Sequence, residues 1–133
     1  MENSIYNNSQ GWETIHGQIV GKANNYQAVP DGQGGKRIIK NEAIRQYERM
    51  FCRACKIYKG RNIDSRFKLE VHIYNRSSRF DLDNGLKTLC DCLQYVGAIK
   101  DDNLCECIEA HKHTDPMRPR VTFRLTETQP RML

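Results

Sequence analysis

The stretch FKLEVHIYNRSSRFDLDNGLKTLCDCLQYV, residues 67–96, changes its hydrophobic period in the middle. Its first residues alternate apolar and polar side chains, which predicts a half-buried strand over 67–74. From Leu82 to Val96 the apolar residues follow at steps of four and three, the spacing of one helix face. Gly97 is the expected end of that helix. A strand that runs into a helix in this way favours an α/β fold.

The flanking sequence repeats these two patterns. We predict a first strand from Trp12 to Val20, a helix over about 40–58, and two later strands at 104–111 and 121–126. The intervening segment from Lys22 to Arg37 is rich in Asn, Gln and Gly, and we predict a long loop there. The expected order is therefore β-α-β-α-β-β, a mixed β-sheet with two main helices.

The length of 133 residues is enough for one core and too short for two full domains. We expect a single compact domain over 1–133, with flexible ends at 1–11 and 127–133. No apolar run approaches the roughly 20 residues of a membrane-spanning helix. The chain begins with polar and acidic residues rather than the pattern of a secretory signal. We therefore expect a cytoplasmic protein.

The net charge of +5 is unevenly distributed along the chain. Residues 22–70 hold 12 Lys and Arg against 5 Asp and Glu, and 71–80 add two arginines. Residues 81–109 hold seven acids against two lysines. A basic body indicates an anionic partner such as nucleic acid. The acidic segment within it suggests a cation held between the protein and that partner.

The six cysteines allow two interpretations. In a cytosolic protein a disulfide framework is not expected, because thiols there are kept reduced. The cysteines are then either small buried hydrophobic residues or ligands of a structural zinc ion. Their spacing, with one CxxC and two CxC pairs, matches zinc sites only loosely. The residues are Cys52, Cys55, Cys90, Cys92, Cys105 and Cys107.

Two acidic pairs carry the possible chemistry. Asp81 and Asp83 stand at the start of the helix in the opening stretch, and Asp101 and Asp102 precede the next strand. An acid at a helix start commonly caps it, so one such residue needs no catalytic explanation. Two pairs from separate segments, however, suit a hard cation such as Mg²⁺, which takes carboxylate oxygens together with substrate phosphate.

Lys87 also has two interpretations. It lies four residues after Asp83 and four before Asp91, so a simple ion pair along the helix explains it. Alternatively, Lys87 positions a phosphate or the attacking water beside the carboxylates. Spacing and charge leave both interpretations open.

The run Asp81-Leu82-Asp83-Asn84-Gly85-Leu86-Lys87, the helix to Gly97 and the pair Asp101-Asp102 together resemble the RusA family of Holliday junction resolvases. The resemblance extends over roughly 15–126 and is most specific at 80–102. Lys22-Ala23-Asn24-Asn25-Tyr26 resembles the family's Asn pair in a basic loop. The resemblance implies a RusA-like fold.

The resemblance also implies roles for single residues. Asp81, Asp83 and Asp102 are expected to bind catalytic Mg²⁺, for which Mn²⁺ substitutes, with Asp101 as a less important ligand. Lys87 is expected to assist at the phosphate. Asp91 matches an acid of the family whose role we take as structural. The expected DNA contacts are Lys22, Asn24, Asn25, Tyr26, Lys36, Arg37, Arg76 and Arg79.

The implied function is that of a Mg²⁺-dependent endodeoxyribonuclease. A homodimer with two equivalent sites is expected to nick opposed strands of a four-way or otherwise branched DNA junction, in recombination, repair or phage DNA processing. Two other interpretations remain open on the residues alone. One is a nucleic-acid-binding module without catalysis, in which the acids only cap helices. The other is a zinc-stabilised interaction protein.

Overall fold

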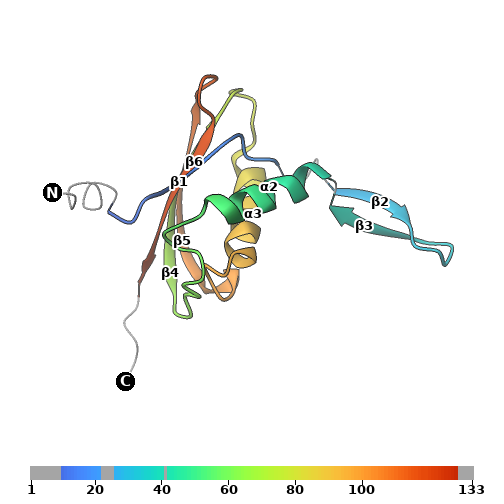
Figure 1. Cartoon of the computed structure of the whole chain (residues 1–133), viewed down its shortest axis with the longest axis horizontal. Helices are drawn as coiled ribbons and strands as arrows, with labels where there is room; N and C mark the ends of the chain where they lie inside the picture. The colour runs from blue at the N-terminus through green and yellow to red at the C-terminus, as the bar shows by residue number, and fades with distance from the viewer. Residues whose placement is uncertain (1–9, 22–25, 41, 129–133) are drawn as a thin grey trace.

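The computed structural model describes residues 10–21, 26–40 and 42–128. Figure 1 shows the elements in chain order. They are β1 (Glu13–His16), β2 (Tyr26–Pro30), β3 (Lys36–Lys40), α2 (Glu42–Ala54), β4 (Phe67–Asn75), α3 (Leu82–Tyr95), the short 3₁₀ helix η1 (Asp102–Leu104), β5 (Cys105–Thr114) and β6 (Arg120–Glu127). No helix in the described ranges is long and apolar enough to cross a membrane.

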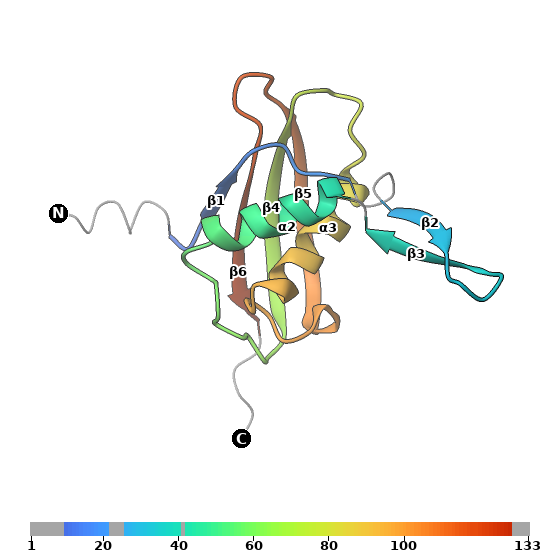
Figure 2. The ribbon, with the colours of Figure 1, turned by 45° about the vertical axis from the view of Figure 1, so that its right-hand side comes forward.

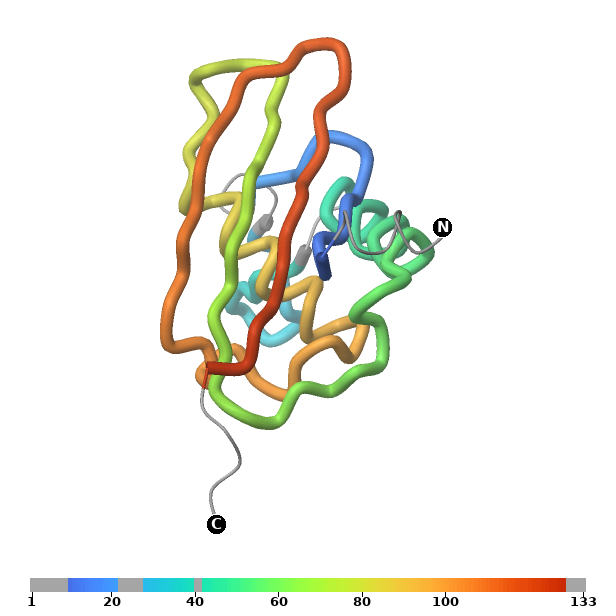
Figure 3. Tube along the Cα trace, turned by 90° about the vertical axis from the view of Figure 1, so that its left-hand side faces the viewer, coloured from blue at the N-terminus to red at the C-terminus, as the bar shows by residue number. Residues whose placement is uncertain are grey.

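The main sheet has four strands in the order β1-β6-β4-β5. β5 runs parallel to β4, whereas β6 is antiparallel to both β4 and β1. The sheet is therefore mixed, and helix α3 is the crossover between the parallel strands β4 and β5. Both helices lie on one face of this sheet, and in the described part of the chain no helix covers the other face (Figures 2 and 3). The prediction of an α/β domain with a mixed sheet and two helices is confirmed.

The core lies between the sheet and the two helices. The apolar positions of β4 are all buried, as the alternation at 67–74 predicts. They pack with the apolar stripes of α2 and α3, including Phe51 and Leu89, which are completely buried. The stripe of one helix and the alternation of one strand thus meet in a single core, because each leaves one apolar face to cover.

The prediction of one long loop from Lys22 to Arg37 is wrong. Within the described residues, β2 and β3 form a separate antiparallel hairpin there. The carboxylate of Asp31 accepts hydrogen bonds from the backbone N–H groups of Gln33 (2.7 Å) and Gly35 (3.0 Å), which closes the turn. Gly32 and Gly34 adopt positive φ, as a tight turn requires. The chain order therefore gains two strands, and the hairpin, here called the arm, projects from the body (Figures 1 and 2).

The predicted helix over 40–58 is also too long, because α2 ends at Ala54. The buried carboxylate of Glu13 accepts the N–H groups of Lys56 (2.7 Å), Ile57 (2.9 Å) and Tyr58 (3.2 Å). These N–H groups donate to Glu13 instead of to backbone carbonyls of the helix, so the helix ends at this point.

The strand boundaries also differ from those predicted. The first strand is shorter than the predicted 12–20, since Gly17 has a φ of +112° directly after β1. At the other end of the chain, β6 reaches Glu127, and most of the two expected flexible ends lies outside the described residues.

Candidate active site

The start of helix α3 holds the first acidic pair. Asp81 occupies the residue before the helix with extended backbone angles, yet its side chain makes no capping hydrogen bond to the helix. Asp83 lies in the first turn, and both side chains are exposed. Helix capping, the simpler explanation for an acid at this position, therefore does not account for Asp81.

Gly85 brings the first turn of α3 close to the sheet. A methyl group at this glycine would lie 2.7 Å from the ring of Phe80 and 2.9 Å from the Cδ1 atom of Ile73. Contacts this short do not occur between real side chains, so a larger residue would push the helix start outward. The glycine therefore positions the carboxylate-bearing turn.

Thr88 ties the same helix to the chain that follows β1. Its hydroxyl donates to the carbonyl oxygen of Val20 at 2.6 Å, with the carbonyl of Asn84 as a second partner at 3.3 Å. Gly21 lies against Asn84, since a methyl group there would contact the Asn84 Cβ atom at 3.5 Å. The segment leading towards the arm thus runs along the helix that carries Asp83 and Lys87.

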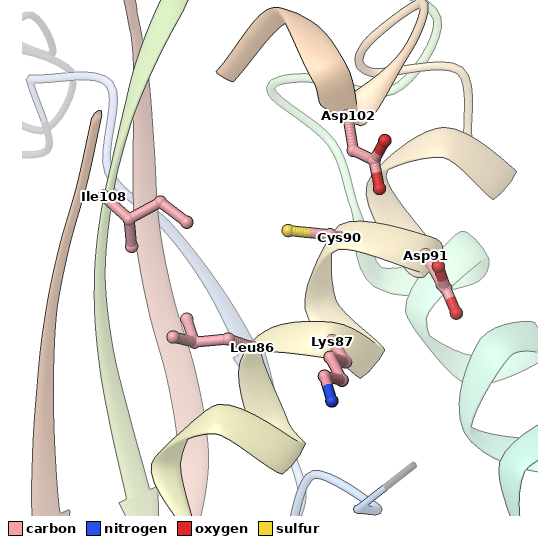
Figure 4. Close-up of a pocket in the computed structure, with 6 residues that line it drawn as sticks. All are labelled: Leu86, Lys87, Cys90, Asp91, Asp102 and Ile108. Atoms are coloured by element: carbon pink, nitrogen blue, oxygen red, sulfur yellow. The ribbon is translucent and has the colours of Figure 1, made fainter. Parts of the chain in front are cut away.

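A pocket of about 210 Å³ lies between α3 and the edge strand β5. It is lined by the polar residues Lys87, Asp91 and Asp102, and by the apolar residues Leu86, Cys90 and Ile108. Figure 4 shows Leu86 and Cys90 of the helix facing Ile108 of the strand, with Asp102 beyond Cys90. The pocket therefore brings together two of the predicted catalytic residues, Lys87 and Asp102.

The members of the second acidic pair have different surroundings. Asp101 is the cap of η1, and its carboxylate accepts the N–H of Asn103 at 3.0 Å. Asp102 instead presents an exposed side chain to the pocket. Asp101 therefore stabilises the start of η1, whereas Asp102 is the member of the pair that lines the pocket.

The acids are not all together within one chain. Asp83 precedes the pocket residue Asp91 by eight positions, a rise of about 12 Å along the helix axis. Asp102, which follows the helix in the chain, lies beside Cys90 and on the Asp91 side of the pocket. In the described part of the chain, no three Asp, Glu, His or Cys side chains are grouped as a metal ion requires. The oxygen donors suit Mg²⁺, but their spacing in one chain does not suit a single ion.

The cysteines of the described residues are likewise not grouped as a metal site requires. The Cys55 thiol donates to Glu13 at 3.3 Å, and burial together with that carboxylate raises its pKa to about 12. Burial also raises the pKa of Cys105. Zinc binds the thiolate, so these two thiols are poorly suited to it. Nothing in the described residues supports the zinc interpretation.

The predicted DNA contacts fall into three groups. Lys22, Asn24 and Asn25 lie outside the described residues, and Tyr26 begins β2. Lys36 and Arg37 are exposed on β3 of the arm. Arg76 and Arg79 are exposed in the turn that leads from β4 to Asp81.

Sequence reasoning did not single out three of the residues that shape the site. Lys112 donates to the carbonyls of Ser78 (3.0 Å) and Phe80 (2.8 Å), which holds the turn before Asp81. Gly85 and Thr88 act through tertiary contacts described above. Only Gly85 left a signal in the sequence, because a glycine inside a helical pattern commonly marks a close approach.

The comparison with protein families gives one result. The family model of endodeoxyribonuclease RusA matches residues 16–126, which include the arm, both helices and both acidic pairs. A search of the curated proteins gives no match.

Proposed function

The chain belongs to the RusA family of Holliday junction resolvases, and from this premise we propose that it cuts four-way DNA junctions by Mg²⁺-dependent phosphodiester hydrolysis. We place this activity in the cytoplasm, in recombination, repair or phage DNA processing. The observation that carries the proposal is the pocket between α3 and β5, which is lined by Lys87 and Asp102 from separate segments.

The carboxylates have the chemistry that a metal-dependent nuclease needs. Asp81, Asp83 and Asp102 are exposed, and Asp81 makes no hydrogen bond to the helix start. A Mg²⁺ ion held by these carboxylates would supply an activated water and charge stabilisation for the leaving oxygen. These three residues are our proposed ligands, with Asp101 in a supporting role because it already caps η1.

Lys87 is proposed to hold the scissile phosphate. Lys87 is exposed and lines the pocket together with Asp102. A phosphate that approaches the acids meets strong repulsion, and a lysine at this position offsets part of it. The lysine therefore orients the reacting group and reduces the electrostatic cost of binding it.

The basic side chains around the site are proposed to contact the DNA backbone. Arg76 and Arg79 lie just before Asp81, and Lys36 and Arg37 lie on the arm. The sequence between β1 and the arm adds Lys22, Asn24 and Asn25, and Tyr26 is the first residue of the arm. Phosphate contacts of this kind position the protein and carry no sequence information.

We also propose that the protein acts as a homodimer. A four-way junction has two opposed strands to cut, and a twofold dimer presents two equivalent sites to them. Light scattering at working concentration is expected to give twice the chain mass of 15.5 kDa.

One experiment tests the activity. The protein is incubated with a synthetic four-way junction, a duplex and a single strand, each with Mg²⁺ or with EDTA. We expect paired nicks in the junction with Mg²⁺, little cutting of the other substrates, and none in EDTA. Binding without any cleavage would favour the alternative of a non-catalytic DNA-binding module.

A further inference from the structure

Helix α2 carries a line of positive charge on the side that faces away from the core. Its buried residues, which include Ile44 and Phe51, pack towards the sheet. Arg45, Arg49 and Arg53 follow one another at steps of four residues, and all three are exposed. Residues four apart lie on the same face of a helix. The outer side of α2 therefore presents three arginines in a row, over about 12 Å of helix.

The positive charge continues into the turn that follows α2. Lys56 and Lys59 are exposed there. The backbone of this turn is held in place, because the buried carboxylate of Glu13 accepts the Lys56 N–H at 2.7 Å and the side chain of Tyr58 is buried. We call the five exposed cations of α2 and this turn the basic strip: Arg45, Arg49, Arg53, Lys56 and Lys59.

Most of the basic strip is not neutralised by acidic side chains. Arg49 pairs with Glu42 at 2.9 Å, but the two side chains are 50% and 62% exposed, and such a pair contributes little in water. The other four cations make no ion pair with an acid within the described residues. The one acid in the sequence from 43 to 61 is Glu48, which is buried.

This arrangement has a cost for the isolated protein. Like charges four residues apart repel each other and destabilise a helix. A helix face that meets only water typically alternates the two signs of charge, which removes the repulsion. A row of arginines without interleaved acids is instead stabilised by an anionic partner. The basic strip therefore indicates a binding surface for a polyanion.

The place of α2 in the fold connects the basic strip with the proposed DNA contacts. The arm, which carries Lys36 and Arg37, ends at Lys40, and α2 begins at Glu42 (Figure 2). On its other side α2 packs against α3, the helix that carries Asp83. DNA that reaches the proposed cleavage site thus has the basic strip on a neighbouring element.

The dimensions and chemistry of the basic strip suit a DNA backbone. One DNA strand advances 3.4 Å for each nucleotide, so the 12 Å line of arginines covers about three to four phosphates. The planar guanidinium group of arginine donates two parallel hydrogen bonds to phosphate oxygens. Both properties favour a duplex over a small anion, which would occupy only one or two of these side chains.

We infer that the basic strip binds the phosphate backbone of a duplex arm of the junction, outside the cleavage site. The inference rests on the proposed junction-cutting function and adds a second DNA-binding surface to it. Phosphate contacts position the protein and read no sequence. The basic strip therefore contributes to affinity and leaves the chemical step unchanged.

A double substitution, Arg45→Gln with Arg53→Gln, tests the basic strip and keeps good helix formers at both positions. Binding of a labelled junction and of a labelled duplex is measured by fluorescence anisotropy in EDTA, which prevents cutting. For both substrates we expect the slope of log K against log salt to fall by up to about 1.8, and the affinity at 0.1 M salt to fall at least about 10-fold. Unchanged slopes would overturn the inference.

The matched control removes two charges elsewhere. Arg66 lies before β4 and Arg118 lies in the turn before β6, and both are exposed. Arg66→Gln with Arg118→Gln should leave the slope close to that of the wild type. An equal fall in this control would attribute the effect to net charge and overturn the inference. So would normal DNA binding by the Arg45→Gln/Arg53→Gln protein together with lost binding of a polyglutamate peptide, because the partner would then be an acidic protein.

Reversing the charges separates DNA binding from a structural role. Arg45→Glu with Arg53→Glu sets an acid four residues before and four residues after Arg49, so repulsion along the helix becomes attraction. We expect the midpoint of urea denaturation to stay the same or to rise, while duplex binding falls further than in the Arg45→Gln/Arg53→Gln protein. A variant that loses stability and DNA binding together would show a structural role and contradict the inference.

Cleavage kinetics distinguish this surface from the cleavage site. With protein in excess over the junction, the Arg45→Gln/Arg53→Gln protein should need a higher concentration for half-maximal cutting and reach the wild-type maximal rate. A lowered maximal rate at an unchanged half-maximal concentration would overturn the inference. If the wild-type protein cuts no junction, the proposed function fails, and the salt dependence of binding in EDTA still decides whether the basic strip binds DNA.

Discussion

The Thr88 hydroxyl donates a 2.6 Å hydrogen bond to the carbonyl oxygen of Val20, which joins helix α3 to the chain that leads into the arm. Thr88 is buried, and Val replaces it with a side chain of nearly the same shape. Thr88→Val leaves the Val20 carbonyl without this donor, so we expect a loss of about 1–3 kcal/mol in the free energy of unfolding, measured by urea denaturation. Thr126→Val, at an exposed site in β6, should change it by less than about 0.5 kcal/mol.

Asp83→Asn should separate binding from cleavage. The amide keeps the size of the side chain but removes the charge, so junction binding in a gel-shift assay should persist. Cleavage should fall by about 100-fold or more, as expected when one charged group is removed from a reacting centre. Asp64→Asn, which removes an exposed acid 3.5 Å from Lys100, is the control and should cut normally. Full cleavage by the Asp83→Asn protein would remove Asp83 from the site.

Lys22→Ala combined with Lys36→Ala should weaken binding and reduce its dependence on salt. Removing one lysine–phosphate interaction lowers the slope of log K against log salt by about 0.9, so the double change lowers it by at most about 2. Binding is measured by fluorescence anisotropy at several salt concentrations. An unchanged slope would exclude both lysines from the DNA interface.

Gly85→Ala should destabilise the protein although alanine is the better helix former. Helix propensity favours alanine by up to about 1 kcal/mol, whereas the clash with Phe80 and Ile73 costs about 1–3 kcal/mol. We therefore expect a net loss in urea denaturation and reduced cleavage. Adding Phe80→Leu should relieve the clash and recover part of both. A Gly85→Ala protein more stable than wild type would show that the helix start has room to move.

Acid should lower the stability of the protein through His72, which lies in strand β4. Burial, and then the neighbouring His111 and His113, lower the pKa of His72 from 6.5, while Glu109 and Glu70 oppose this shift. The His72 Nδ1 and His113 Nε2 atoms lie 2.8 Å apart. Below pH 6.5 the unfolded chain takes up the proton more readily, so stability falls as the pH drops from 6.5 towards the lowered pKa. His72→Gln should flatten this part of the profile of unfolding free energy against pH.

The order of the main elements could be predicted from the sequence because each element shows one clear period. β4 alternates without interruption, and the apolar stripe of α3 is regular to Val96. The arm was missed because its signal lies in turn chemistry: Asp31 closes the turn through backbone contacts that composition alone does not reveal. The end of α2 was missed because Glu13, 41 residues earlier in the chain than Ala54, takes up the N–H groups beyond it.

The site was predictable only in part. The residue types and their order along the chain identified Lys87 and Asp102, which line one pocket. The separation of Asp83 from Asp102 was not predictable, since it depends on how α3 packs as the crossover that connects β4 and β5. Close contacts such as that of Gly85 with Phe80 depend on tertiary packing and leave at most a weak trace in sequence.

The position of α3 as the crossover between β4 and β5 also affects when activity arises during folding. Parallel strands cannot be joined by a short turn, so β4 and β5 are connected through the helix. The helix must therefore dock while residues 38 positions apart in the chain, such as Phe67 and Cys105, become paired. Such non-local pairing is slow compared with helix formation. Asp83 in the first turn of α3 and Asp102 beyond it in the chain thus reach their places only with the finished sheet, so a partly folded chain does not yet have the proposed site assembled.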